Sequence, residues 1–207
     1  NDAVNTTTSS TSPLFLNFSV STGATYRFNA TVNDTAGNSN STATRIVQID
    51  TDSPTVNYVS PTESAGAFRS RNYIEINMTA TDTNLQTLEI RLYNSTNDRI
   101  QLNTSATSPF YINYSGLSEG IYYYNVSAND SAGNTANAAT RNITLDSVLP
   151  LITYGTGAES DGANLSRNNI YVNVSVTETN ENTITFRLFN SSGQYNVTPY
   201  TGGAVRT

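Results

Sequence analysis

The chain has 207 residues, of which 36% are hydrophobic and 13% charged, and its formal net charge is −6. It contains no Cys, His, Trp or Lys, which excludes disulfides, thiolate or imidazole zinc ligands, a Cys nucleophile and a His base. The acidic balance and the scattered Arg residues argue against nucleic acid as a partner, and no apolar run approaches the roughly 20 residues that cross a bilayer, so no membrane segment is expected.

One pattern runs through the whole chain: the sequence matches itself without a gap at an offset of 96 residues. Three pairs of segments fix this register, namely residues 12–19 with 108–115, 33–38 with 129–134, and 70–72 with 166–168. A repeat of about 100 residues has the size of an immunoglobulin-like sandwich and is too long for a solenoid repeat. The sequence therefore predicts an all-β fold of tandem immunoglobulin-like antiparallel β-sandwiches.

Apolar and polar residues alternate with a period of two over several short segments, which is typical of half-buried strands. In chain order the predicted strands run through residues 74–80, 88–92, 110–112, 122–128, 143–145 and, in the later copy, 170–176. Residues 130–134 are predicted to form the turn between the strands at 122–128 and 143–145. In that turn Gly133 suits the left-handed conformation, and the Asp130 side chain can bind the turn backbone.

Residues 117–122, Leu-Ser-Glu-Gly-Ile-Tyr, resemble the tyrosine corner of fibronectin-type and immunoglobulin-like sandwiches. Together with residues 126–134 and 145–150, they make the chain similar to the tandem immunoglobulin-like repeats of bacterial and archaeal surface proteins. This resemblance covers the whole chain and implies a scaffold and its setting, not a ligand. The earlier copy departs from the corner pattern, with Thr-Gly-Ala-Thr-Tyr at residues 22–26.

Both ends of the chain fall inside a repeat, since Asn1 corresponds to Asn97 and Thr207 corresponds to Tyr111. The expected organisation is the C-terminal half of one repeat (1–51), a complete repeat (52–146) and the N-terminal part of a further repeat (147–207). A half sandwich exposes strand edges and an apolar face. Two interpretations stay open: a window from a longer chain, or a filament in which the C-terminal part of one copy completes the N-terminal half of the next.

The sequence carries 16 Asn-X-Ser/Thr sequons. They predict covalent N-glycans and an extracellular, cell-surface location, and the prokaryote-like repeat without Cys points to an archaeal surface. Several of the Asn residues lie on the polar phase of a predicted strand, where a bulky glycan fits. The candidate acceptors are Asn5, Asn17, Asn29, Asn33, Asn40, Asn77, Asn94, Asn103, Asn113, Asn125, Asn129, Asn142, Asn164, Asn173, Asn190 and Asn196.

Four aromatic residues precede a sequon by two positions and share its strand phase: Phe15, Tyr111, Tyr123 and Tyr171. Our hypothesis is that the glycans of the protein itself cover these rings. Cross-strand pairing and a contact surface for other chains are the alternatives.

Acidic residues recur with the repeat, and we expect them to converge where a linker meets the loops of adjacent sandwiches. At the second junction the predicted group is Glu63, Asp146, Glu178 and Asn180, and Asp50, Asp52 and Asp82 are further junction candidates. Such oxygen ligands suit calcium, which takes roughly six to eight of them. Solvated turn residues are the alternative. A glycosidase pair of acids is disfavoured, because a catalytic site is not expected in identical form in every repeat.

These patterns predict a protein that is not an enzyme and that needs no cofactor beyond structural calcium. The expected function is a heavily glycosylated structural component of a cell-surface filament, stalk or S-layer-like coat, with other copies of itself as partners. The alternative is an adhesin stalk segment that presents a ligand-binding module located elsewhere.

Overall fold

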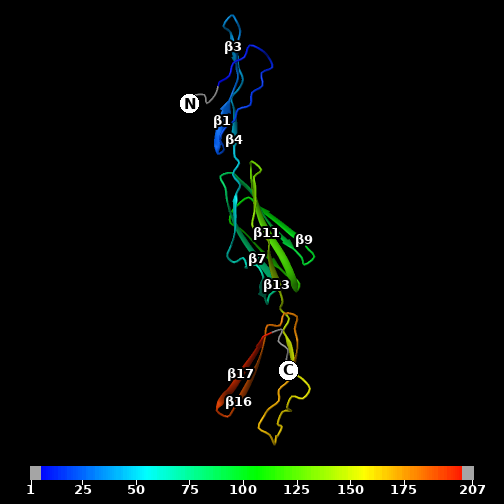
Figure 1. Ribbon diagram of the computed structural model, residues 1–207. Helices are drawn as coiled ribbons and strands as arrows, with labels where there is room; N and C mark the ends of the chain where they lie inside the picture. Colours follow the sequence, from blue (N-terminus) through cyan, green and yellow to red (C-terminus); the bar gives the residue numbers. More distant parts are fainter. Residues whose placement is uncertain (1–5, 202–207) are drawn as a thin grey trace. The chain divides into compact units, whose positions relative to one another are not determined.

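The computed structural model describes residues 6–201, and these residues form 17 strands and no helix, which confirms the predicted all-β class (Figure 1). Within this described part, no helix is long and apolar enough to cross a membrane. The chain divides into two compact units, Asn1–Asp146 and Ser147–Thr207.

The complete repeat, residues 52–146, is an immunoglobulin-like sandwich of two sheets (Figure 1). One sheet has the strand order β10-β7-β5, and the other has the order β6-β13-β11-β8-β9, with the short β12 also paired to β11. All neighbours are antiparallel except β13 and β6, which are parallel. The strands are β5 (Thr55–Val59), β6 (Ala67–Arg69), β7 (Tyr73–Thr81), β8 (Leu85–Tyr93), β9 (Arg99–Ser105), β10 (Phe110–Ser115), β11 (Gly120–Asp130), β12 (Thr135–Asn137) and β13 (Arg141–Leu145).

The core of this sandwich is made by the apolar phase of its strands. Along β7 every second side chain is buried, and the same alternation continues in β8. Because successive side chains of a strand point to opposite faces, this period-two pattern places one complete apolar set between the two sheets. The fully buried side chains are Ile74, Ile76, Met78, Leu88, Ile90, Leu92, Tyr124, Val126, Ile143 and Leu145, together with one acid, Asp130.

The predicted turn at residues 130–134 forms, but it joins β11 to β12 and not to β13, which follows after a further short loop. One oxygen of Asp130 accepts hydrogen bonds from the N–H groups of Ala132 (2.9 Å) and Asn134 (2.8 Å), and the other accepts from the Asn134 amide (2.7 Å). Gly133 has a φ of 95°, the left-handed conformation that glycine tolerates best. The short β12 was missed because three residues are too few to show a period.

The tyrosine corner is present in both copies. The Tyr122 hydroxyl donates to the carbonyl oxygen of Ser118 (3.0 Å). In the earlier copy the Tyr26 hydroxyl donates to the carbonyl oxygen of Ser21 (3.1 Å) and accepts from the Ser21 N–H (3.0 Å). The corner therefore tolerates a different loop sequence, since the tyrosine bonds to backbone atoms alone.

The first 51 residues pair their strands as the complete repeat does. The strands are β1 (Ala24–Phe28), β2 (Thr31–Asn33), β3 (Ser39–Ser41) and β4 (Arg45–Ile49). In β1 and β4 Ala24 lies opposite Ile49, as Gly120 lies opposite Leu145 in β11 and β13, 96 residues later. The hairpin of β2 and β3 matches that of β11 and β12 in the same way. The sequence repeat is thus also a repeat of backbone hydrogen bonding.

The second unit repeats the strand pairing of the N-terminal part of the complete repeat. It contains β14 (Leu151–Tyr154), β15 (Val174–Thr177), β16 (Thr183–Asn190) and β17 (Gly193–Thr201). Leu151 lies opposite Thr177, as Thr55 lies opposite Thr81 in the complete repeat. β16 and β17 differ from β8 and β9 by a slip of one residue. The strand predicted over 170–176 begins only at Val174, because within the described chain residues 170–173 have no strand beside them.

Candidate functional site

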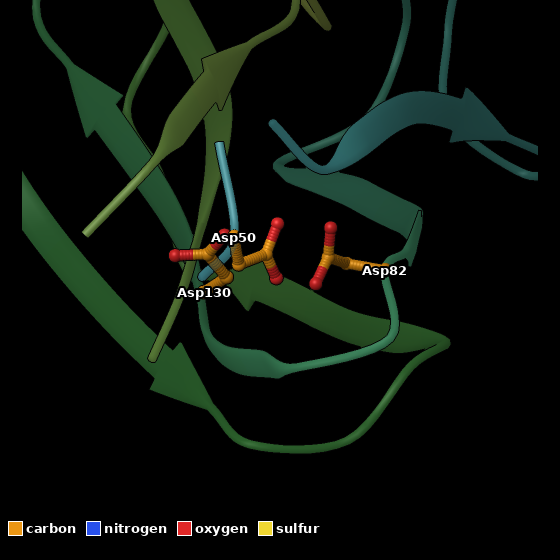
Figure 2. Close-up of side chains that lie close together, drawn as sticks. All are labelled: Asp50, Asp82 and Asp130. Atoms are coloured by element: carbon orange, nitrogen blue, oxygen red, sulfur yellow. The ribbon is translucent and has the colours of Figure 1, made fainter. Parts of the chain in front are cut away.

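Three carboxylates meet at the end of the complete repeat where the chain enters it (Figure 2). Asp50 follows β4 directly, Asp82 follows β7, and Asp130 ends β11. One carboxylate oxygen from each side chain lies within 4.8 Å of the other two. We call these three residues the acidic cluster. It joins the linker between the first two repeats to two loops at the tip of the sandwich.

Hydrogen bonds hold the linker against these loops. The Asn84 amide donates to an oxygen of Asp50 (2.5 Å), and the Asn134 amide donates to the Asp50 carbonyl oxygen (3.2 Å). The N–H of Asn84 in turn donates to Asp82 (2.7 Å). Two asparagine side chains therefore position the carboxylates through neutral donors, which leaves the negative charge of the cluster in place.

Asp130 is the most enclosed member of the acidic cluster, with no exposed surface. Burial disfavours its charged form, but hydrogen bonds from the Asn134 side chain and from the turn backbone outweigh that effect and hold the pKa of Asp130 below its usual value. In the earlier copy, the corresponding hydrogen bonds from Asn38 and Ala36 lower the pKa of Asp34. Asp130 is therefore ionised at neutral pH although it is buried.

The donor set of the acidic cluster fits a hard divalent cation. Carboxylate oxygens are the ligands that calcium prefers, and a calcium ion draws the remainder from backbone carbonyls and water. Each carboxylate oxygen has more than one lone pair, so an oxygen that already accepts an N–H can also ligate a metal. Arg side chains form ion pairs with Glu63, Glu75, Glu89 and Glu159, and none of these acids belongs to the acidic cluster.

Of the sequence-predicted ligands, Asp50 and Asp82 lie in the acidic cluster, and Asp130 was missed. Asp52 contributes only its N–H, which donates to Asp50 (3.1 Å). Asn180 donates its N–H to Glu178 (2.9 Å) within the second unit. The gathering of these two residues with Asp146 stays a prediction.

Glu63, another predicted ligand, is held between two arginines. Its carboxylate accepts hydrogen bonds from Arg69 (2.7 Å, from Nε) and from Arg71 (3.0 Å), and it forms ion pairs with both. The Arg69 hydrogen bond is the main reason that the pKa of Glu63 is lowered. The repeat preserves the Arg71 half of this arrangement, since Glu159 pairs with Arg167, whereas Leu165 stands at the position that corresponds to Arg69. The ion pair is therefore the observed role of Glu63, and its part in a metal site stays a prediction.

The candidate glycan acceptors fall into two groups by exposure, and Asn5 lies outside the described residues. Exposed side chains belong to Asn17, Asn29, Asn33, Asn40, Asn113, Asn164, Asn190 and Asn196. Half-buried side chains belong to Asn77, Asn94, Asn103, Asn125, Asn129, Asn142 and Asn173. The first group offers room for a sugar without any change in the fold.

Two half-buried acceptors turn the reactive nitrogen toward the protein. The Asn77 amide nitrogen donates to the carbonyl oxygen of Ser60 (2.8 Å), and the Asn173 nitrogen donates to that of Thr156 (3.0 Å), 96 residues later. The Asn77 side-chain oxygen is buried without a hydrogen-bond partner. A glycan would replace one of the two N–H groups on either nitrogen and would have to fit beside a hydrogen bond that the repeat conserves.

The aromatic rings beside the sequons are not equivalent. Phe15 is 88% exposed, and Tyr171 and Tyr111 are about half exposed, whereas Tyr123 is half-buried. The Tyr111 hydroxyl donates to Glu75 on the neighbouring strand (2.8 Å). Tyr111 therefore makes the cross-strand contact that was one alternative, and Phe15 and Tyr171 remain open to a sugar.

No protein-family model matches the sequence, and no curated protein matches it. Among solved structures the chain is similar to an engineered protein, with a TM-score of 0.36 and 18% identity over 49% of this chain and 22% of that one. It is also similar to the FN1–FN3 domains of chicken CNTN1, with a TM-score of 0.38 and 18% identity over 61% and 44%. It is similar as well to the fibronectin(III)-like modules of Clostridium thermocellum CbhA, with a TM-score of 0.36 and 14% identity over 73% of this chain and 80% of that one. The chain spans less than half the length of the first two, and at these identities the likeness says nothing of function.

Proposed function

We propose that this chain is a structural component of an extracellular cell-surface array, a filament, stalk or S-layer-like coat that carries N-glycans. The observation that carries the proposal is the 96-residue repeat of strand pairing, turn and ion pair. A module that repeats its strand pairing at a fixed interval supplies length and stiffness. A catalytic site would instead distinguish one copy from the others.

The polar groups buried in the complete repeat serve the scaffold. Asp130 and Ser127 are the buried polar side chains of the described residues. Asp130 closes the turn after β11, and Ser127 accepts a hydrogen bond from Arg91 (2.9 Å). Both have structural tasks, which favours a scaffold over a catalyst.

The sugar coat is supported by the eight exposed acceptors. They lie on strands and loops of both units, where a glycan adds a hydrated layer over a surface that has few charges. Such a coat shields backbone and exposed apolar side chains from proteases and from other proteins. An extracellular location follows from this modification.

Structural calcium is part of the proposal. An ion in the acidic cluster would bind Asp50 of the linker together with Asp82 and Asp130 of the sandwich. It would offset their mutual repulsion and restrict the linker, as a stiff array requires.

Glycopeptide mass spectrometry of the native protein, combined with antibody labelling of intact cells, tests this function. We expect glycans at the exposed acceptors, surface labelling without permeabilisation, and lower occupancy at Asn77 and Asn173 than at Asn113. A native protein without glycans, or one labelled only after the cells are opened, would refute it.

An adhesin stalk is the second candidate, favoured by the exposed rings of Phe15 and Tyr171, because sugars stack on aromatic faces. Binding of the native chain to a carbohydrate array, lost on Phe15→Ala and Tyr171→Ala, would support this candidate. A structural array instead predicts no loss of assembly in these variants.

A further inference from the structure

Two parts of the described chain carry matching unpaired surfaces. In the complete repeat, β11 has β13 on one side and β8 on the other. Within the described residues, its copy β1 pairs with β4 alone. The second neighbour in the complete repeat is β8, and β16 is the copy of β8, since residues 183–190 correspond to 87–94.

A second pair of segments shows the same match more directly. Residues 14–19 are the copy of β10, and residues 169–173 are the copy of the first half of β7. In the complete repeat these two strands pair, with Ile112 opposite Ile76 and Tyr114 opposite Ile74. Neither copied segment is a strand in the structure. In the part of the chain that the structure describes, residues 14–19 have no copy of β7 beside them, and residues 169–173 have no copy of β10 beside them.

The apolar side chains of these segments are exposed where their copies are buried. Ile170 is 57% exposed and Val172 is 46% exposed, whereas Ile74 and Ile76 are fully buried. On the other segment Phe18 is 43% exposed, whereas its copy Tyr114 is 8% exposed. Both surfaces therefore carry the side chains of a sandwich interior without the opposite sheet.

We propose that residues 147–201 of one copy complete the sandwich begun by residues 12–51 of a second copy. The complete repeat supplies the expected register: Leu16 opposite Val172, Phe18 opposite Ile170, and Phe28 opposite Leu188. The contact joins two different surfaces, so it propagates head to tail without closing. This inference deepens the filament form of the proposed function and names the strands that form it.

The occupant in this proposal is a second copy, because the strand positions that stay unpaired beside residues 12–51 are those of strands in residues 147–201. β14 and β15 supply the places of β5 and β7, and β16 supplies the place of β8. β17 already fills the place of β9 beside β16. The composite therefore contains every long strand of the complete repeat.

Complementary variants of the full chain, produced without glycans, test this inference. Leu16→Glu puts a charge on the surface formed by residues 12–51, and Val172→Glu puts a charge on the surface formed by residues 147–201. We expect the parent chain to form concentration-dependent oligomers in sedimentation velocity and each variant alone to be monomeric. An equimolar mixture should give a one-to-one dimer that grows no further, because one intact surface of each kind remains. An unfolded variant could not give that dimer.

Tyr171→Glu is the matched control. It places the same charge one residue from Val172, on the opposite strand phase, and it reproduces the residue found in the complete repeat, Glu75. We expect this variant to assemble as the parent does. Loss of assembly in Tyr171→Glu equal to that in Val172→Glu would overturn the assigned register.

The absence of cysteine allows a direct measure of register. The double variant Leu16→Cys/Val172→Cys should give a ladder of covalent oligomers on a non-reducing gel after mild oxidation, and Leu16→Cys/Val176→Cys should not. A parent chain that stays monomeric at all concentrations, or a cross-link confined to single chains, would overturn the inference. Neither result would contradict the proposal of a glycosylated surface protein, so failure of this inference can be distinguished from failure of the proposed function.

Discussion

An Ile→Ala substitution can be made at two positions 96 residues apart, one buried and one exposed, and its effect on stability can be compared between them. Ile74 lies on β7 and is fully buried, whereas its copy Ile170 is 57% exposed. Replacement of either by Ala removes three carbon atoms. Any difference in the free energy of unfolding therefore reports the surroundings and not the chemistry of the substitution.

The expected magnitudes follow from burial. At about 0.8 kcal/mol per carbon, Ile74→Ala loses roughly 2.4 kcal/mol of transfer free energy. The cavity adds to this, so the total is about 3–5 kcal/mol. Ile170 has less than half of its surface covered, so Ile170→Ala should cost about 1 kcal/mol or less, with no enclosed cavity.

Urea unfolding followed by far-ultraviolet circular dichroism measures both costs, at concentrations where the chain is monomeric. Ile74→Ala should lower the midpoint of the complete repeat by about 1–5 M, given a slope of about 1–3 kcal/mol per M. Ile170→Ala should leave that transition unchanged. At concentrations where copies associate, its cost should rise toward that of Ile74→Ala. Equal costs at low concentration would refute the reasoning.

Three further outcomes are expected. The melting temperature should be higher in calcium than in EDTA, because calcium at 100 times its dissociation constant adds about 2.7 kcal/mol to the free energy of unfolding. Asp82→Asn should abolish this response to calcium, whereas Asp98→Asn should retain it. Tyr122→Phe should cost about 1 kcal/mol through the lost corner hydrogen bond, and Tyr26→Phe less, because that bond is exposed. The pKa of Glu63 is depressed from its ordinary value of 4.5, so its contribution to stability is full above pH 4.5 and is lost as the pH falls further.

Each of these has a contrary result. An identical melting temperature in calcium and EDTA would argue for solvated turn acids. A larger cost for Tyr26→Phe than for Tyr122→Phe would contradict the exposure of the first corner. The pH dependence is measured as the urea midpoint between pH 7 and pH 3, where Glu63→Gln should lose less stability on acidification than the parent; an equal loss would show that the ion pair with Arg69 and Arg71 is not responsible.

Much of the fold could be predicted from the sequence because the apolar residues of each long strand follow period two. The 96-residue register extended that prediction from one copy to the others. The strand at 170–176 was predicted too long for a physical reason: a period records which face a side chain prefers, but hydrogen bonds to a neighbour decide whether a strand forms.

The acidic cluster was predicted in part. Asp50 and Asp82 were identified because carboxylates recur at those positions. Asp130 was not among the predicted ligands, although its side chain serves both the turn and the acidic cluster. For Glu63 the signal that was missed is the arginine eight residues later, which recurs as Arg167 after Glu159. Pairing between loops depends on which ends of the strands meet, which spacing alone does not give.

The parallel pairing of β6 and β13 determines how a repeat responds to tension. Their register joins Ala67 with Ile143 and Arg69 with Leu145, and the N–H of Asp146 adds a bond to the Arg69 carbonyl oxygen (3.0 Å). The chain enters β6 and leaves β13 at opposite ends of this pair. A pulling force therefore slides the two strands past each other and loads all of their hydrogen bonds at once, whereas an antiparallel hairpin would open one bond at a time. The complete repeat thus carries its own mechanical clamp.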